Sequence, residues 1–490
     1  MQLYGVSVKQ VMMGVVFLLI CGLVALLGAQ NRNAERSEIV IAIANAPITL
    51  DPKRATDATS VRLLRLVGQG LVRLDDSLTP QPALASDFVK IDDANYVFTV
   101  PSVRFSNGKK VTPALLKAYY EGIVMSNSPI RGLFDDISRI DVYDDKIRFN
   151  LSTPNPWFWE AMALPVVDMD GGVPHGSGGF EVLDVAPQSV LLRRVADGQK
   201  VRFLTVKDPM VRVLKLMQNE VDVVHNDIPV ELVNHAEEGV SVLASPSASY
   251  TYMGFLMDNG ATADVRVRKA VSMAIDRGAI IDSLLGGYAG AADSLLQPAH
   301  GAFWRADVAY NPKRARALLA EAGYADGLAL SLSITTNPFV LRVAQVLQQQ
   351  LAEVGIHLSI NSSEWGTFYG NIKKGNFDAY ILTWVGNFTP EIYNSVFHSA
   401  HKPPMGANRG RYDSAEMDAL LDDMMAATEV EQRYRLVRGV QKLQHKDMVY
   451  VPLWRKHNVA LVSDVVRGYT MPLDGGFEGA LTVDTLRVGG

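Results

Sequence analysis

The sequence has little of several features that often narrow a protein's function. It contains one cysteine, Cys21, in 490 residues, so neither an intramolecular disulfide nor a thiolate metal cluster can form within the chain. Its 47 Lys and Arg against 52 Asp and Glu give a formal net charge of -5. Nucleic-acid binding needs an excess of positive charge, and we therefore expect no nucleic-acid partner.

Motifs for catalysis are missing as well. The chain has no GxxxxGK[ST] phosphate loop, no HExxH, no GxSxG and no CxxC. Gly68-Gln69-Gly70 lacks the third glycine of a dinucleotide-binding fingerprint. His398 and His401 form the only close histidine pair, with no acidic or cysteine ligand nearby in the sequence. The sequence therefore predicts no catalytic residue, no metal and no cofactor, and hence a protein that is not an enzyme.

The N-terminus carries the clearest signal for location. Residues 11–28 are an uninterrupted apolar run, preceded by Lys9 and followed by a polar stretch. Such a run fits either a signal peptide or a short membrane helix, and both imply export. Cleavage after Ala29 would place Leu27 where a small residue is expected, so an uncleaved anchor stays open beside a signal peptide.

The remaining chain has the composition of a globular protein, with 48% hydrophobic and 20% charged residues. Its length implies at least two domains. The first half is β-rich, with a strand at 38–44 and hairpins at 140–151 and 180–195. Thr112 and Pro113 begin a helix as N-cap and first-turn proline. A strand, a helix and a short strand between 200 and 224 form a β-α-β unit.

The second half is predicted to be α/β. Asp264 caps a long helix over 265–285, which two glycines end. Alternating apolar residues at 328–334 and 356–360 predict two strands, and helical spacing at 340–354 places a helix between them. This order requires a parallel crossover. A mostly apolar strand at 377–384 and two helices near 414–446 follow.

One segment carries a specific family signature. Residues 264–277 read DVRVRKAVSMAIDR and resemble the signature of the family 5 extracellular solute-binding proteins. These are the dipeptide-, oligopeptide- and nickel-binding receptors of ABC importers. Further stretches similar to family blocks follow the expected order: LDP at 50–52, GLV at 70–72 with PALA at 82–85, VRFSNG at 103–108, EVDVV at 220–224, YNP at 310–312 and PLW at 452–454.

The resemblance implies an α/β, bilobed fold of the type II periplasmic binding protein kind. Its first lobe is discontinuous and carries an extra β-rich subdomain, and the ligand is enclosed between the lobes by hinge closure. We assign 1–30 to the signal peptide or anchor, 38–60, 166–248 and 452–490 to lobe I, 61–165 to the subdomain, and 249–451 to lobe II.

The resemblance also implies ligand contacts on the loop after residues 50–52. In peptide-binding relatives this loop supplies cleft contacts, which here points to Thr56, Asp57 and Ala58. A plain turn and a helix N-cap would explain the same residues equally well.

A second set of candidates follows from a Trp-x-x-Asp stretch of the family, which matches Trp384-Val385-Gly386-Asn387. In relatives the Trp packs on the ligand and the Asp pairs with a peptide's α-ammonium. Asn387 is neutral where that carboxylate should stand, and a charge-assisted hydrogen bond is roughly twice as strong as a neutral one. Peptide-amine recognition is therefore in doubt, and Trp384 as a core residue remains the alternative.

Two tyrosines complete the candidate ligand contacts. Tyr250 and Tyr252 alternate on the strand that enters lobe II, where a half-buried strand could equally use them for packing. Arg266 and Arg268 match the family signature, and we assign them to structure.

These observations predict a bacterial envelope receptor. It would capture a peptide or peptide-sized solute and deliver it to the permease of an inner-membrane ABC importer. The alternative is a membrane-tethered sensor or interaction protein that keeps the fold without transport. The expected location is the periplasm or the outer face of the inner membrane, with the membrane contacted through the N-terminal segment.

Overall fold

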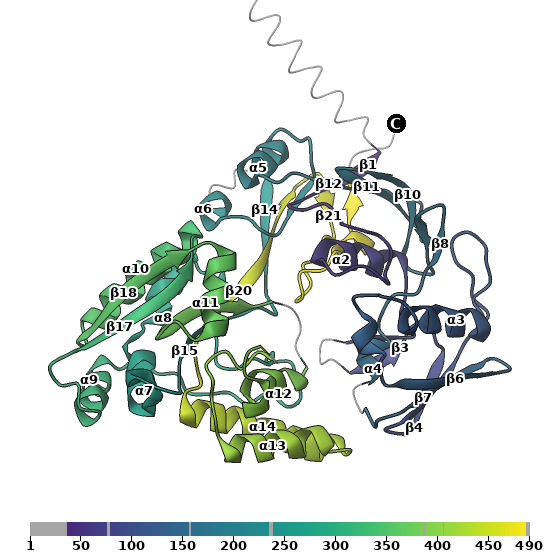
Figure 1. Ribbon diagram of the computed structural model, residues 1–490. Helices are drawn as coiled ribbons and strands as arrows, with labels where there is room; N and C mark the ends of the chain where they lie inside the picture. Colours follow the sequence, from purple (N-terminus) through teal and green to yellow (C-terminus); the bar gives the residue numbers. More distant parts are fainter. Residues whose placement is uncertain are drawn as a thin grey trace, which may run out of the picture.

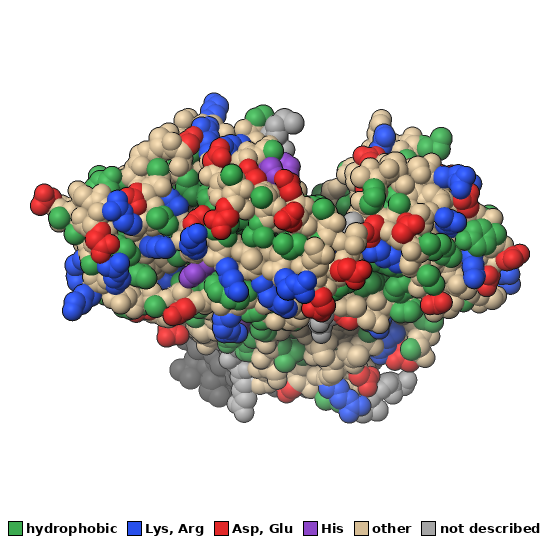
Figure 2. All heavy atoms as spheres, turned by 90° about the horizontal axis from the view of Figure 1, so that it is seen from below, with side chains coloured by type: hydrophobic (Ala, Val, Ile, Leu, Met, Phe, Trp, Pro, Cys, Tyr) green, Lys and Arg blue, Asp and Glu red, His purple; other side chains and the backbone are tan. Residues whose placement is uncertain are grey.

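The protein is described here by a computed structural model covering residues 37–75, 79–155, 158–234, 239–385, 389–404 and 406–486. Within these residues, one twelve-stranded sheet runs through two lobes, and a separate four-stranded sheet forms a subdomain (Figure 1). Figure 2 shows one face of the molecule, which is hollowed between two masses. The expected α/β bilobed architecture is confirmed.

Lobe I contains the first half of the large sheet. Its strand β1 (Glu38–Ile43) is buried along all but its first residue, as expected for a strand inside a sheet. β1 pairs in parallel with β12 on one side and β13 on the other. The other strands and the helices of this lobe include β10 (Phe180–Ala186), β11 (Ser189–Arg194), β12 (Lys200–Thr205), β13 (Val223–His225), β14 (Val240–Pro246), the ladder β21 (Val466–Arg467) to β22 (Asp484–Thr485), α2 (Ala58–Val67), α5 (Pro209–Met217) and α6 (Val230–Val233).

The subdomain has its own aromatic core. Tyr96 and Phe98 are fully buried and alternate along one strand, so both lie on the same face of the sheet. They pack against Phe149 and Tyr120. The sheet order is β4 (Asp87–Asp92), β5 (Asn95–Thr99), β7 (Lys146–Leu151) and β6 (Ile137–Tyr143), with helices α3 (Pro113–Val124) and α4 (Phe158–Ala161) and the small ladder β2 (Val72–Leu74) to β3 (Pro80–Pro82). A second small ladder, β8 (Asp168–Asp170) to β9 (Val173–His175), lies beside α2 and β10 of lobe I.

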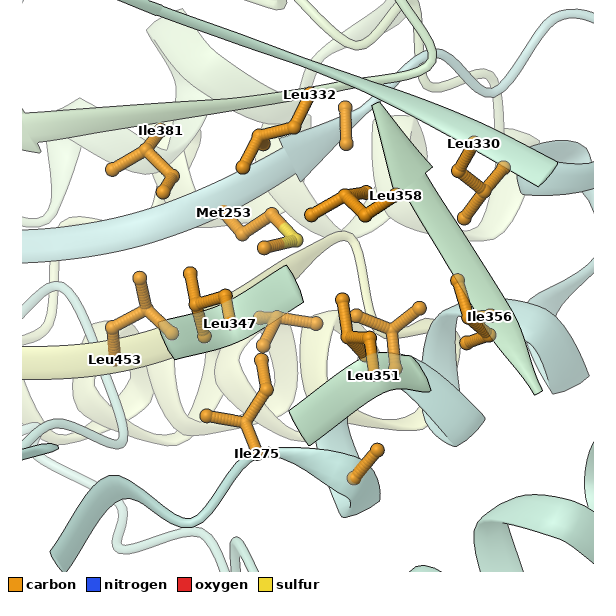
Figure 3. Close-up of a cluster of buried hydrophobic side chains, with 14 of the residues drawn as sticks. Met253, Ile275, Leu330, Leu332, Leu347, Leu351, Ile356, Leu358, Ile381 and Leu453 are labelled. Carbon is orange, nitrogen blue, oxygen red and sulfur yellow. The ribbon is translucent and has the colours of Figure 1, made fainter. Parts of the chain in front are cut away.

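Lobe II has the predicted β-α-β unit. β17 (Leu328–Thr335) and β18 (Ile356–Ser363) pair in parallel, and α10 (Pro338–Ala352) connects them. Leu332, Leu347 and Leu358 from these elements meet Met253 in a buried apolar cluster (Figure 3). The remaining elements are β15 (Tyr250–Phe255), β16 (Ala289–Ala291), β19 (Ala379–Trp384), α9 (Pro312–Glu321), α11 (Trp365–Lys374), α12 (Glu391–Phe397), α13 (Ala415–Ala426) and α14 (Val430–Asp447).

The long helix predicted over 265–285 is wrong. The structure has two helices, α7 (Val265–Ala274) and α8 (Arg277–Leu284), because Ile275 is extended and Asp276 caps the second helix through the Ala279 N–H at 3.0 Å. The buried Arg277 donates to the carbonyl oxygens of Ser272 and Ile275 at 3.0 and 3.2 Å. These are carbonyls that the end of α7 leaves without helical partners.

The two lobes are joined where one long strand passes between them. β20 (Tyr450–Ser463) pairs with β15 of lobe II over its first residues and with β14 of lobe I from His457 onward. The segment 247–249 makes the other crossing, between β14 and β15. The predicted boundary at 451/452 therefore falls inside β20.

A further predicted boundary, at 60/61, falls inside α2. Leu63, Leu64 and Val67 of this helix pack with Ile39 and Phe203 in the core of lobe I. Amphipathic spacing predicts the helix but does not identify the sheet that it covers. The separate core of the subdomain begins at Leu71.

The apolar run at 11–28 lies outside the described residues. Among the helices of the described ranges, none combines the length and the hydropathy needed to cross a bilayer. The prediction of a signal peptide or anchor at 1–30 therefore stays a prediction.

Candidate ligand-binding cleft

A cleft of about 860 Å³ lies between the lobes, next to the two chain crossings. Lobe I contributes the turn after β13 and the start of α6. Lobe II contributes the start of α10 and the end of β19. The crossings themselves contribute Ser247 to Ser249 and Lys456 to Val459. The volume lies within the range typical of small-molecule sites, about 300 to 1,000 Å³.

The lobe I wall of the cleft is built on an uncommon turn. Asn226 and Asp227 have φ angles of 56° and 52°, in the left-handed region that Asn and Asp tolerate better than most residues. The Asn226 side chain donates to Oδ1 of Asn458 at 3.0 Å and accepts from the Val459 N–H at 3.2 Å. These bonds fix the turn to β20, and Asp227 is left exposed at the cleft.

Beneath this turn lies a buried neutral histidine. His225 is 2% exposed, and its ring nitrogens contact the Tyr469 hydroxyl at 2.7 Å and the Gly475 carbonyl oxygen at 3.0 Å. A carbonyl only accepts, so Nε2 carries the proton and Nδ1 accepts from Tyr469. Burial lowers the pKa of His225 to about 4.

Two acidic residues that line the cleft have charged partners. Glu231 of α6 accepts from Arg342 of α10 at 2.9 Å, in an ion pair that joins the lobes. Asp474 is paired with Arg65, a residue of α2 outside the lining. Arg62, one turn before the end of α2, lines the cleft and donates to the Asp474 carbonyl oxygen at 3.0 Å.

The predicted loop contacts lie at the start of α2. Asp57 is the N-cap and accepts from the Ser60 N–H at 2.9 Å, while Thr56 and Ala58 are exposed. Ala58 lies one turn before Arg62, on the same side of the helix. None of the three lines the cleft itself, and their role as ligand contacts stays a prediction.

Of the predicted Trp-x-x-Asn stretch, the structure describes Trp384 and Val385. Val385 is 73% exposed and lines the cleft, directly after β19. Trp384 is half-buried, and the Arg409 guanidinium carbon lies 4.4 Å from its ring centroid. Asn387 lies outside the described residues. Ligand contact by Trp384 and Asn387 remains a prediction.

The predicted tyrosines lie in the core of lobe II. Tyr250 and Tyr252 are 1% and 0% exposed. Tyr252 stacks on Tyr450 with ring centroids 4.0 Å apart, and the Arg455 guanidinium lies 5.5 Å from the Tyr250 centroid. Their rings therefore contact core side chains here, and a ligand role for either tyrosine remains a prediction.

Arg266 and Arg268, the two arginines of the family signature, make contacts within lobe II, in keeping with a structural role. Arg268 is buried and donates to the carbonyl oxygens of Thr262 at 2.8 Å and Met448 at 3.1 Å. Arg266 bonds to Asp264 and to the Glu321 carbonyl oxygen. They tie α7 to neighbouring segments of lobe II.

Sequence reasoning missed several residues that the fold brings to the cleft. Asp227, Lys456 and Arg342 line it, and they come from three distant segments. Lys456 follows the family-like block at 452–454, which was the only available signal. Within the described ranges, no group of three or more His, Cys, Asp or Glu side chains is arranged to hold a metal ion.

Comparisons with known proteins agree with this architecture. The family model for bacterial extracellular solute-binding proteins, family 5 Middle, matches residues 79–405. The glutathione-binding protein GsiB of Escherichia coli (strain K12) is 24% identical over 480 residues, which cover 90% of this chain and 93% of GsiB. Heme-binding protein A of Haemophilus influenzae is 24% identical over 504 residues, covering 90% and 91%.

Solved structures show the same fold. The ABC transporter substrate-binding protein CtaP of Listeria monocytogenes matches with a TM-score of 0.81 and 21% identity, over 92% of this chain and 99% of CtaP. The family model spans more than half of the sequence. This chain therefore belongs to family 5 of the bacterial extracellular solute-binding proteins.

Proposed function

We propose that the protein captures a peptide or peptide-sized solute between its lobes and delivers it to the permease of an ABC importer. The observation that carries this proposal is the cleft of about 860 Å³ at the two chain crossings, lined by both lobes. Rotation about two short crossings opens or closes such a cleft without disturbing either core. GsiB, which is named for glutathione, supports a ligand of tripeptide size.

Capture is tested by native mass spectrometry of the exported portion, purified without refolding. Anything that co-purifies is then released by denaturation and identified. Short peptides or another solute of that size support the proposal. A protein that stays empty after challenge with glutathione and a peptide library contradicts it.

Delivery needs a separate test in cells. Deletion of the gene should abolish or reduce uptake of the solute found by mass spectrometry, and expression of the full chain should restore it. Unchanged uptake of every bound solute would contradict delivery and favour the tethered sensor.

We also propose that residues 1–30 export the protein, as a signal peptide or as an anchor. The support is the apolar run at 11–28. Cell fractionation and the intact mass of the exported form distinguish these two. A shortened soluble species indicates cleavage, and a full-length species in the membrane fraction indicates an anchor.

A further inference from the structure

Lys456 occupies a central position in the cleft. It lies on β20 where the strand leaves lobe II, and Ala289 of β16 is its pairing partner there. Its backbone carbonyl accepts from the Ser247 N–H of the other crossing at 3.1 Å. Its side chain lines the cleft, so the Lys456 ammonium is held at the point where the two lobes join.

The contacts of this ammonium are incomplete. Nζ lies 4.2 Å from the ring centroid of Phe339, the second residue of α10. Within the described ranges, no carboxylate oxygen lies within 4.0 Å of it, and no hydrogen bond to a protein acceptor is made. An aromatic face attracts a cation but does not neutralise it.

The described acidic residues around the cleft form no ion pair with the Lys456 ammonium. Glu231 is engaged by Arg342, and Asp474 by Arg65. Asp227 acts on Lys456 only through space, without an ion pair. The Lys456 residue is exposed at the cleft wall, so a ligand can reach its ammonium, and partial desolvation by the surrounding protein lowers its pKa.

Arg62 adds a second cation from the lobe I side. Its guanidinium donates to a backbone carbonyl and lies 5.9 Å from the ring centroid of Phe477, and no ion pair involves it in the described part of the chain. Two cations therefore face one cleft, and neither has a direct carboxylate partner among the described residues.

We propose that Lys456 is a specificity-determining residue that binds a carboxylate of the ligand, with Arg62 adding positive potential from lobe I. The ligand is thus a solute with a free carboxylate, such as a peptide with an unblocked C-terminus. This inference rests on the proposed function and names its ligand class. Closure of the lobes would remove the carboxylate from water and strengthen the pairing.

Matched tripeptides provide the test. Trialanine with a free C-terminus and trialanine amide differ by one negative charge and almost nothing else. We expect the wild-type protein to bind the acid at least about tenfold more tightly, by titration calorimetry. Equal binding of acid and amide overturns the inference while leaving peptide capture intact. Binding of neither form, repeated with a mixed tripeptide library, refutes peptide capture and with it this inference.

Substitutions test whether Lys456 causes the preference for the acid over the amide. Lys456→Met keeps the apolar stem over Phe339 and should abolish the preference for the acid, and Lys456→Arg should retain it. Lys313→Met, at an exposed lysine of α9 outside the cleft, controls for the loss of one positive charge. A preference that survives in Lys456→Met overturns the assignment to Lys456. If Lys456→Met does not fold, the comparison of acid and amide binding by the wild-type protein still tests whether the protein recognises a carboxylate.

Discussion

The guanidinium of Arg409 lies over the indole of Trp384, with 4.4 Å between its central carbon and the ring centroid. The same group donates to the Tyr252 hydroxyl at 3.2 Å and lies 5.7 Å from the ring centroid of Tyr369. One face of the tryptophan is therefore covered by a cation. Arg409 links the end of β19 to α11 and to the buried tyrosines of lobe II.

Replacing Arg409 by Met should lower the free energy of unfolding by about 1 to 2 kcal/mol. The variant loses a partly desolvated cation–π contact and the hydrogen bond to Tyr252. Urea denaturation followed by tryptophan fluorescence measures the change. Arg435→Met, at an exposed arginine of α14, is the control and should change stability by less than about 0.5 kcal/mol. Equal effects of the two substitutions would show that Arg409 contributes no specific contact.

Arg277→Met should be among the most destabilising single changes in lobe II, at about 3 kcal/mol or more. The guanidinium donates to the Pro452 carbonyl oxygen at 2.6 Å as well as to the end of α7. Its loss leaves buried carbonyls without donors. Arg277→Lys keeps the charge without the planar set of donors and should recover only part of the stability. Urea midpoints measure both variants, and a loss below about 1 kcal/mol for Arg277→Met would contradict this role.

Two carboxyl groups should make the stability of the folded protein fall as pH rises. Burial raises the pKa of Glu160 in α4 to about 8 and that of Glu391 in α12 to about 7. Unfolded carboxyls titrate near 4.5, so between about pH 4.5 and 8 the folded state binds more protons than the unfolded state. The contribution is fully present below about pH 4.5 and is lost as pH rises through the folded pKa values.

Thermal unfolding between about pH 6.5 and 8.5 measures this effect, because His225 is largely neutral in both the folded and the unfolded state over that range. Glu391→Gln should flatten the decline in the midpoint, because one of the two buried acids is gone. Glu416→Gln, at an exposed residue of α13, should leave the decline unchanged. A wild-type profile that rises across this range would contradict the prediction.

His225 should have the opposite effect at lower pH. Its pKa is lowered from 6.5 to about 4, so between these values the unfolded state binds more protons. Stability from the neutral imidazole is therefore fully present above about pH 6.5 and is lost as pH falls toward 4. Nuclear magnetic resonance titration of the ring should give a pKa of about 4. A pKa for His225 near 6.5 would refute its neutral, buried state.

Much of the secondary structure follows from local sequence signals. Thr112 before Pro113 and Asn311 before Pro312 begin helices, and the Asp264 side chain caps α7. These signals act within one helical turn, so they can be recognised without knowledge of the fold. The same logic failed at residues 275 and 276, because periodic apolar residues continue across a break that Arg277 stabilises by donating to the nearby Ser272 and Ile275 carbonyls and to the distant Pro452 carbonyl.

The candidate site was less predictable than the helices and strands. Val385 lines the cleft, whereas Tyr250 and Tyr252 lie in the core of lobe II, and ligand contact by all three stays a prediction. A strand with residues buried on both faces gives no sign of which side meets a cleft. Asp227 and Lys456 carried no distinguishing pattern of their own.

The amino-acid sequence by itself determined the family, the α/β class, most helix starts and the apolar segment at 11–28, because each depends on residues close together in the chain. Tertiary structure decided which residues face the cleft. Lys456, Asp227 and Arg342 lie far apart in sequence and meet only because β20 passes between the lobes. Whether a charged side chain gains an ion-pair partner depends on this packing, which among the described residues gives Lys456 no ion pair with a carboxylate.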